Sequence, residues 1–235
     1  MNGCADMIEK IISSDETIQE ESNTFAKGEC FYKYLTIFII GSLLGVIYED
    51  ILHLMKTGEF MTHRGEMFLP LNPLYGFGIM LLMVGLSKIK EWYHCIVYGS
   101  IVGGGIEYFA SWGLELISGQ IAWDYSHLPT NIDGRTTVYI ALFWGVCGFL
   151  LAKFVYPYLA CFIESWPKKI ATIIIKTIWI VMIIDMVVSY LVLSRQMLRS
   201  KGYESFTFIG ETIDRVFTDE RIEVFFPNMR TQVKE

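Results

Sequence analysis

Residues 123–135 read WDYSHLPTNIDGR, a polar, turn-rich stretch that separates two long apolar segments. Those segments, Gly99–Ile117 and Thr137–Ile163, each look long enough to cross a bilayer, because about 20 apolar helical residues span a hydrocarbon core of about 30 Å. A loop that only joined two helices would not need this concentration of polar chemistry, so we place the function here. The side chains that we expect at or just inside a membrane face are Asp124, Asn131 and Arg135.

The composition is typical of an integral membrane protein. Of 235 residues, 53% are hydrophobic and 19% are charged, and the mean hydropathy is +0.41. These values are too apolar for an ordinary soluble domain. The net charge of -6 comes largely from the two ends of the chain, and nothing in it indicates nucleic-acid binding. The length allows about four to six crossings and leaves no room for a large separate catalytic domain.

We therefore predict an all-α polytopic membrane protein with about five transmembrane helices. The second span is expected to be broken or re-entrant, because prolines and glycines near its start remove helical hydrogen bonds that must be replaced at membrane depth. The predicted spans are about Tyr32–Met55, Met67–Leu86, Trp92–Ile117, Thr137–Phe162 and Ile170–Leu193. Around this membrane domain (31–194), residues 1–30 are predicted as an acidic arm or amphipathic surface helix, and 195–235 as a polar tail.

Five crossings put the polar loops 56–66 and 123–135 on the same side of the membrane. We expect these two loops to converge with Glu49, Glu107 and, as a further candidate, Glu115 on one cavity that opens to that side. The Lys and Arg residues are evenly divided between the two sides, so the positive-inside rule gives a tie. If the arginines of the two loops are retained for function, the remaining count favours a cytoplasmic N-terminus.

Carboxylates inside predicted spans are candidates for a binding, proton-relay or ion-pair role, because each costs about 2.5–3.5 kcal/mol to insert. Glu49, Glu107 and Asp185 meet this description. Ser111 and Glu115 follow Glu107 at intervals of four, which places all three on one helix face. The alternative is that each carboxylate reaches water near a span end and pairs with a neighbouring cation.

The two loop arginines offer planar guanidinium groups beside glycine, an arrangement suited to a carboxylate or a phosphate. Arg64 precedes Gly65, and Arg135 follows Gly134. They can equally be interfacial anchors or partners of Asp124 and Glu107. The complete set of candidate ligand-binding residues is Glu49, Arg64, Asn72, Tyr75, Glu107, Ser111, Trp123, Asp124, Tyr125, Asn131, Arg135 and Asp185.

No known catalytic motif assigns an enzyme activity. The chain has no phosphate-binding loop for ATP hydrolysis, no His-Glu-x-x-His and no Gly-x-Ser-x-Gly. The five cysteines lack Cys-x-x-Cys spacing, and the four histidines do not form a convincing metal set. We predict no metal and no cofactor, and assign no catalytic residue.

Several of these motifs together resemble a known family, the small bacterial integral membrane proteins described as putative ABC-transporter type IV or ABC transporter permease-like. One departure is Ala122, where the family pattern leads us to expect an aromatic residue. The motifs that match are Tyr48-Glu49, Arg64-Gly65, the run from Pro70 to Gly78, Glu107-Tyr108, Ser111-Trp112, Glu115, Trp123–Ser126, Asn131, Gly134-Arg135, Phe143–Gly145, and Asp185 with Ser189. The resemblance implies a multi-helix protein of a bacterial inner membrane.

The first functional hypothesis is a permease-like protein whose polar intramembrane cavity binds or transports a small solute, with an anion as one option. The second is an intramembrane enzyme acting on a lipid or polyprenyl phosphate, with Asp124 or Glu107 as acid or base and the loop arginines holding the phosphate. The third is a structural or regulatory partner of other membrane proteins, favoured if the polar residues pair only with one another. The partners left open are membrane lipids, a small-molecule ligand, and a second copy or other membrane subunits.

Overall fold

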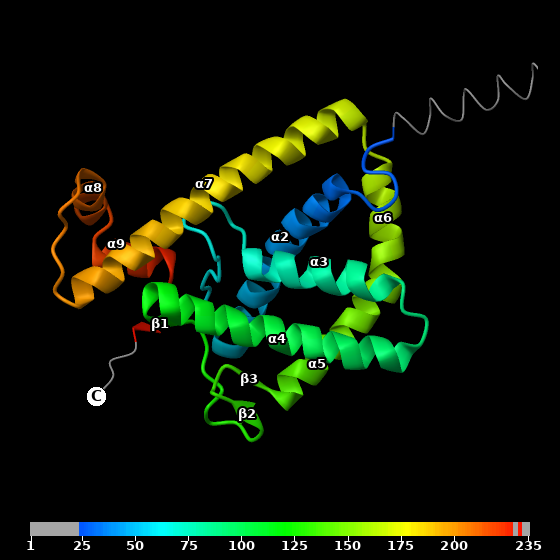
Figure 1. The fold of residues 1–235 in the computed structure, drawn as a ribbon, viewed down its shortest axis with the longest axis horizontal. Helices are drawn as coiled ribbons and strands as arrows, with labels where there is room; N and C mark the ends of the chain where they lie inside the picture. The colour runs from blue at the N-terminus through cyan, green and yellow to red at the C-terminus, as the bar shows by residue number, and fades with distance from the viewer. Residues whose placement is uncertain (1–23, 228–229, 232–235) are drawn as a thin grey trace, which may run out of the picture.

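The computed structural model describes residues 24–227 and 230–231, and its helices confirm the all-α prediction. The amphipathic surface helix predicted within residues 1–30 falls almost entirely outside these residues. Figure 1 shows the arrangement of the helices and short strands. In chain order they are α2 (Phe31–Thr57), α3 (Pro73–Ser87), α4 (Trp92–Ser118), β1 (Gln120–Ile121), β2 (Asn131–Ile132), β3 (Thr136–Thr137), α5 (Val138–Leu150), the π-helical turn η1 (Leu151–Val155), α6 (Tyr156–Glu164), α7 (Lys168–Ser200), α8 (Phe208–Val216), α9 (Asp219–Phe225) and β4 (Arg230–Thr231).

Within the described residues, three helical stretches are long and apolar enough to cross a membrane: α2, the continuous run Val138–Glu164 and α7. The predicted count of five was higher. The helix α3 is apolar but has 15 residues, or about 22 Å at 1.5 Å per residue, which is shorter than a hydrocarbon core. The helix α4 has 27 residues but includes polar side chains and several glycines. Five crossings, and a re-entrant second one, stay predictions.

Local sequence signals explain where the helices begin and end. The Asn72 side chain accepts a hydrogen bond from the Leu74 amide at 3.2 Å and Pro73 follows it, so α3 starts there and the polar chain before it is not helical. Thr137 caps α5 in the same way through the Ile140 amide at 3.1 Å. Gly58 and Gly119 end α2 and α4 with positive φ angles of 74° and 66°.

Glycines allow α2 to approach α3 closely, and α4 to approach α5. The pairs with the most extensive packing are α2 with α3 and α4 with α5. A Cβ at Gly45 would lie 2.2 Å from the Cβ of Tyr75, and one at Gly103 would lie 2.3 Å from the Cβ of Trp144. The small residues on α2 and α4 thus position an aromatic side chain on each partner helix.

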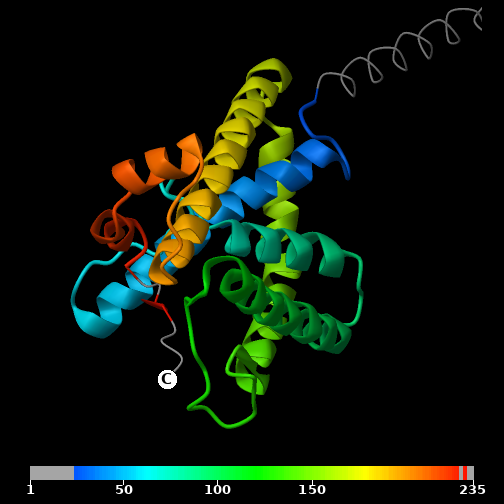
Figure 2. The same cartoon turned by 60° about the vertical axis from the view of Figure 1, so that its left-hand side comes forward.

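The chain after residue 194 continues as helix and packs onto α7. Figure 2 shows α8 and α9 beside the C-terminal part of α7. Ile222 and Phe226 are buried against Val192 and Leu193 of α7 and against Met67 of the segment between α2 and α3. The predicted polar tail therefore contributes buried apolar residues to the same core.

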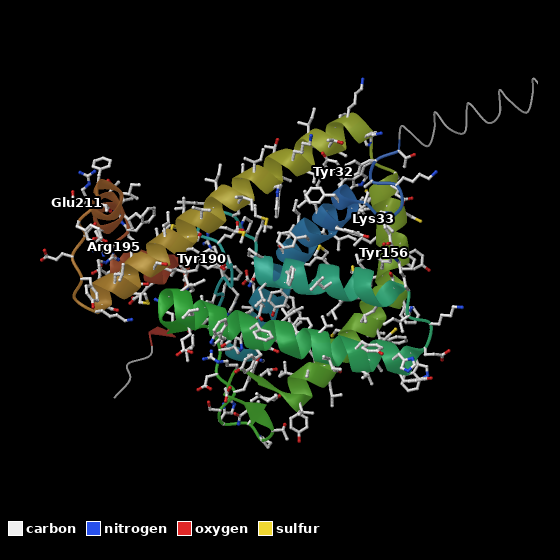
Figure 3. All side chains as sticks on the ribbon, in the orientation of Figure 1. Tyr32, Lys33, Tyr156, Tyr190, Arg195 and Glu211 are labelled. Atoms are coloured by element: carbon white, nitrogen blue, oxygen red, sulfur yellow. The ribbon has the colours of Figure 1, made fainter. Side chains whose placement is uncertain are left out.

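Ion pairs complete this contact. Arg195, labelled in Figure 3, donates to both oxygens of Asp214 on α8, with N to O distances of 2.7–2.9 Å. Arg199, one turn further along α7, bonds to Asp214 at 2.5 Å and to Asp219 at 2.6 Å. Burial acts to raise the pKa of Asp214, but the two arginines outweigh it and hold that pKa below its usual value.

Candidate functional site

Five polar and aromatic side chains from five different segments meet in what we call the acid–aromatic cluster. Its members are Glu49 of α2, Tyr75 of α3, Glu107 of α4, Tyr125 of the loop before α5 and Trp144 of α5. Tyr75 donates its hydroxyl hydrogen to Glu49. Glu107 accepts from the Tyr125 hydroxyl at 2.9 Å and from the Trp144 indole nitrogen at 3.2 Å. The rings of Tyr75 and Trp144, with centroids 6.0 Å apart, join the two halves.

The two carboxylates of this cluster have aromatic donors but no cationic partner. Among the described residues, no Lys, Arg or His forms an ion pair with Glu49 or Glu107. Both glutamates are partly exposed, and the neighbouring Tyr48 is 46% exposed with its ring 6.4 Å from that of Tyr75. The cluster therefore presents negative charge and aromatic rings together, on the side of Tyr48.

Tyr125 is a permanent donor in this cluster. Burial is the largest influence on its pKa, and the negative charge of Glu107 adds to it, so the pKa lies well above the usual range for a phenol. The hydroxyl group thus keeps its hydrogen near neutral pH and donates it to Glu107.

Asp124 and Asn131 shape the loop 123–135 through hydrogen bonds within it, and their role in binding a ligand stays a prediction. Asp124 accepts from the amide and hydroxyl of Ser126 at 2.8 and 2.6 Å. These two bonds hold the pKa of the Asp124 carboxyl below its usual value, the hydroxyl contributing most. Asn131 donates to the Leu128 carbonyl at 2.8 Å and accepts from the Gly134 amide at 3.1 Å. The strands β2 and β3 then close the loop as an antiparallel pair.

The Arg135 side chain joins this loop to α4. It forms an ion pair with Glu115 and donates to the Ser111 hydroxyl at 3.2 Å, and its carbonyl accepts from the Trp123 indole nitrogen at 2.9 Å. The predicted helix face of Glu107, Ser111 and Glu115 is therefore used, but its Arg135 partner is Glu115 rather than Glu107 or Asp124. This guanidinium already has protein acceptors.

Arg64 lies in a different part of the molecule. Its guanidinium donates to the Met67 carbonyl at 3.1 Å and stands 5.9 Å from the ring centroid of Phe225 on α9. The structure thus does not bring the two loop arginines together.

Asp185 forms a second polar group, the Asp185 anchor, which consists of Asp185, Ser189 and the backbone of residues 67–69. Its carboxylate accepts from the amides of Met67, Phe68 and Leu69 at 3.2, 3.0 and 2.7 Å, and from the Ser189 hydroxyl at 3.2 Å. The mid-helix carboxylate therefore fixes the chain that leads into α3. Protein donors surround its oxygens, and its role in binding a ligand stays a prediction.

Asn72 and His63 hold the same segment against α2. The Asn72 amide group donates to the His63 carbonyl at 3.2 Å, and the Asn72 backbone donates to the Ser42 carbonyl at 3.0 Å. The His63 amide donates to Asp50 at 2.7 Å. Asn72 thus positions α3, and with it Tyr75.

Two residues of interest were missing from the predicted set. Trp144 was quoted only as part of a motif, although its position one residue before Gly145 on an apolar helix is compatible with a packed indole. Glu66 was treated as the end of a polar loop, but it is 1% exposed. A signal was available for Glu66, because it directly precedes the apolar run that begins at Met67.

Comparison with known proteins gives one family. The model of the putative ABC-transporter type IV family matches residues 36–190, which include both polar groups described above. No curated protein and no solved structure matches the chain.

Proposed function

Because the chain belongs to the putative ABC-transporter type IV family, we propose that it is a permease-like membrane protein that binds a small cationic solute at the acid–aromatic cluster. One observation supports this above all. Glu49 and Glu107 reach the same place from α2 and α4, and their partners there are neutral aromatic donors.

The chemistry of the cluster favours a cation. Two carboxylates in a partly desolvated site repel each other and lack a compensating charge, and a bound cation relieves both penalties. The rings of Tyr75 and Trp144 add attraction, since a cation within about 6 Å of an aromatic centroid gains about 0.5–2 kcal/mol. An organic amine can use both features, which a simple anion cannot.

The anionic solute considered from the sequence has less support. Arg135 is paired with Glu115, and Arg64 lies against α9, so neither is free at the cluster. The same positions weaken the case for an enzyme acting on a lipid phosphate, which would need a guanidinium to hold the phosphate. Asp124, one of its two proposed acid or base residues, accepts hydrogen bonds from Ser126.

A structural or regulatory membrane subunit is the second candidate function. Its support is that many of the polar residues pair with one another, as in the Arg135–Glu115 ion pair and the Asp185 anchor. Residence in a bacterial inner membrane with a cytoplasmic N-terminus remains part of our proposal for either function.

Native mass spectrometry of the protein, gently extracted from its own membrane, tests the proposal. We expect a small amine-bearing molecule on the wild type and its loss in Glu107→Gln. Glu91→Gln, the same charge change at an exposed position before α4, is the control and should retain the molecule. A phosphate-bearing lipid in its place would favour the enzyme. A ligand-free protein that co-purifies with other membrane subunits would favour the structural role.

A further inference from the structure

Glu66 is a buried carboxyl group that the acid–aromatic cluster does not use. Its residue is 1% exposed, and neither carboxyl oxygen has a hydrogen-bond partner among the described residues. An ionised carboxylate in this state would raise the free energy of the folded protein strongly, because burial removes its hydration and no hydrogen bond or opposite charge compensates for the loss.

The groups around Glu66 add no compensating positive charge. Two residues of α7 interact electrostatically with Glu66. Asp185 repels a negative charge on Glu66, and Tyr190, labelled in Figure 3, is close enough for its own ionisation to be disfavoured by that charge. On its own segment, Arg64 is directed to the Met67 carbonyl and the Phe225 ring. Met67, the residue after Glu66, packs against two apolar side chains, Ile222 of α9 and Phe226 directly after that helix.

Asp185 and Glu66 have opposite hydrogen-bonding states. Asp185 uses its oxygens as acceptors for three amides and a hydroxyl, the pattern of a charged carboxylate. Glu66 has no such donors. Burial and the nearby charge of Asp185 raise the pKa of Glu66 to about 8, with burial the larger cause.

We propose that Glu66 is a proton-binding site, and that its protonated side chain keeps residues 66–69 seated on Asp185. When the Oε–H bond breaks, the proton passes to water and a second negative charge remains beside Asp185 in an apolar setting. Repulsion and the gain of hydration then release residues 66–69 from α7. The chain directly before α3 is in this way a proton-responsive element. This proton-binding site is independent of the solute and of the acid–aromatic cluster.

The raised pKa of Glu66 determines how the seating of residues 66–69 depends on pH. The seated state binds the proton more tightly than the released state, whose carboxyl has the ordinary value of 4.5. Seating is therefore complete below 4.5 and is lost as the pH rises toward 8. Between these two pH values the equilibrium constant for opening should increase about tenfold per pH unit. Above pH 8 it should become constant.

Hydrogen exchange of the Met67, Phe68 and Leu69 amides in the full-length protein, in nanodiscs, measures this opening. After correction for the intrinsic pH dependence of exchange, we expect the one-proton slope in the wild type and no slope in Glu66→Gln. Glu59→Gln, an exposed position in the same connecting segment, is the matched control and should keep the slope. A flat profile in the wild type, or a slope retained in Glu66→Gln, overturns the proposal.

Infrared spectroscopy keeps the proposal testable if Glu66→Gln does not fold. In wild-type protein with isotope-labelled glutamate, a protonated carboxyl C=O band should be present at about pH 6. It should disappear with a midpoint near 8. Absence of a labelled band at the lower pH would contradict a proton on Glu66.

Discussion

Tyr75 of α3 donates its hydroxyl hydrogen to Glu49 of α2 at the level where Gly45 gives the Tyr75 side chain room to lie against α2. A glycine and an acid one turn apart on α2 thus position the same tyrosine. A comparable relationship on α4 links Gly103, Trp144 and Glu107. Close helix packing and the acid–aromatic cluster are therefore two consequences of the same sequence pattern.

Gly103→Ala should disturb Trp144 and weaken the cluster, because the new methyl group would lie 2.3 Å from the Trp144 Cβ. Overpacking of this kind costs about 1–3 kcal/mol. Gly105→Ala is the control, since a Cβ there meets nothing within 4 Å. Unfolding midpoints in detergent should fall for Gly103→Ala and stay unchanged for Gly105→Ala. Equal midpoints for the two variants would show that the α4–α5 approach is not tight.

Arg135→Ala and Glu115→Gln should each loosen the loop 123–135, because each leaves a partly buried charge without its partner. The double variant should lose less than the sum of the two, with a coupling of about 1 kcal/mol. Thermal unfolding of the four proteins in one detergent gives this coupling. Strict additivity would mean that the ion pair contributes nothing to the loop.

Asp185→Ala should release residues 67–69, because three backbone amides lose a charged acceptor. A hydrogen bond to a charged group contributes about 1.5–3 kcal/mol. The loss of three such bonds should therefore lower the free energy of unfolding by a large amount. Ser189→Ala removes a hydroxyl group that accepts from the Met67 amide at 2.9 Å and donates to Asp185 at 3.2 Å, and it should cost less, about 1–2 kcal/mol. Chemical unfolding measures both. A smaller effect for Asp185→Ala than for Ser189→Ala would argue against the anchor.

Acid should detach α8 from α7. The pKa of Asp214 is lower in the folded protein than its usual value of 3.8. The contribution of Asp214 is therefore present above 3.8 and is lost as the pH falls through the folded value. Limited proteolysis within α8 by an acid-active protease should become faster in that window. Asp214→Asn should be cleaved readily by a protease that is active near neutral pH, and resistance of this variant would contradict the role of the arginine pairs.

The sequence predicted the helices well where long apolar runs are bounded by strong signals. The helix expected over about Trp92–Ile117 is observed as α4 at Trp92–Ser118, and Gly119 ends it with a positive φ. The family resemblance was confirmed by the match over residues 36–190. The number of membrane crossings was harder to predict. The 15-residue α3 is short for a span, and the glycine-rich α4 is long enough but carries polar side chains.

The pairing of polar residues could not be read from local patterns. Arg135 lies 20 residues from Glu115, and both Asp124 and Glu107 were equally reasonable partners before the loop geometry was known. The burial of Glu66 depends on the packing of α7 and α9 around Met67, which comes from chain more than a hundred residues away. Such long-range contacts carry no periodic signal in the sequence.

The most direct test of the proposed cation site is an equilibrium titration of the nanodisc-embedded protein with choline, a quaternary amine, and with inorganic phosphate as an anion. We expect choline to bind the wild type and Glu91→Gln, and Glu49→Gln and Glu107→Gln each to weaken it about 10-fold to 100-fold, as expected for loss of about 1.5–3 kcal/mol. Phosphate should not bind. Binding of phosphate in place of choline, or choline affinity unchanged in both variants, would contradict a cation site at Glu49 and Glu107.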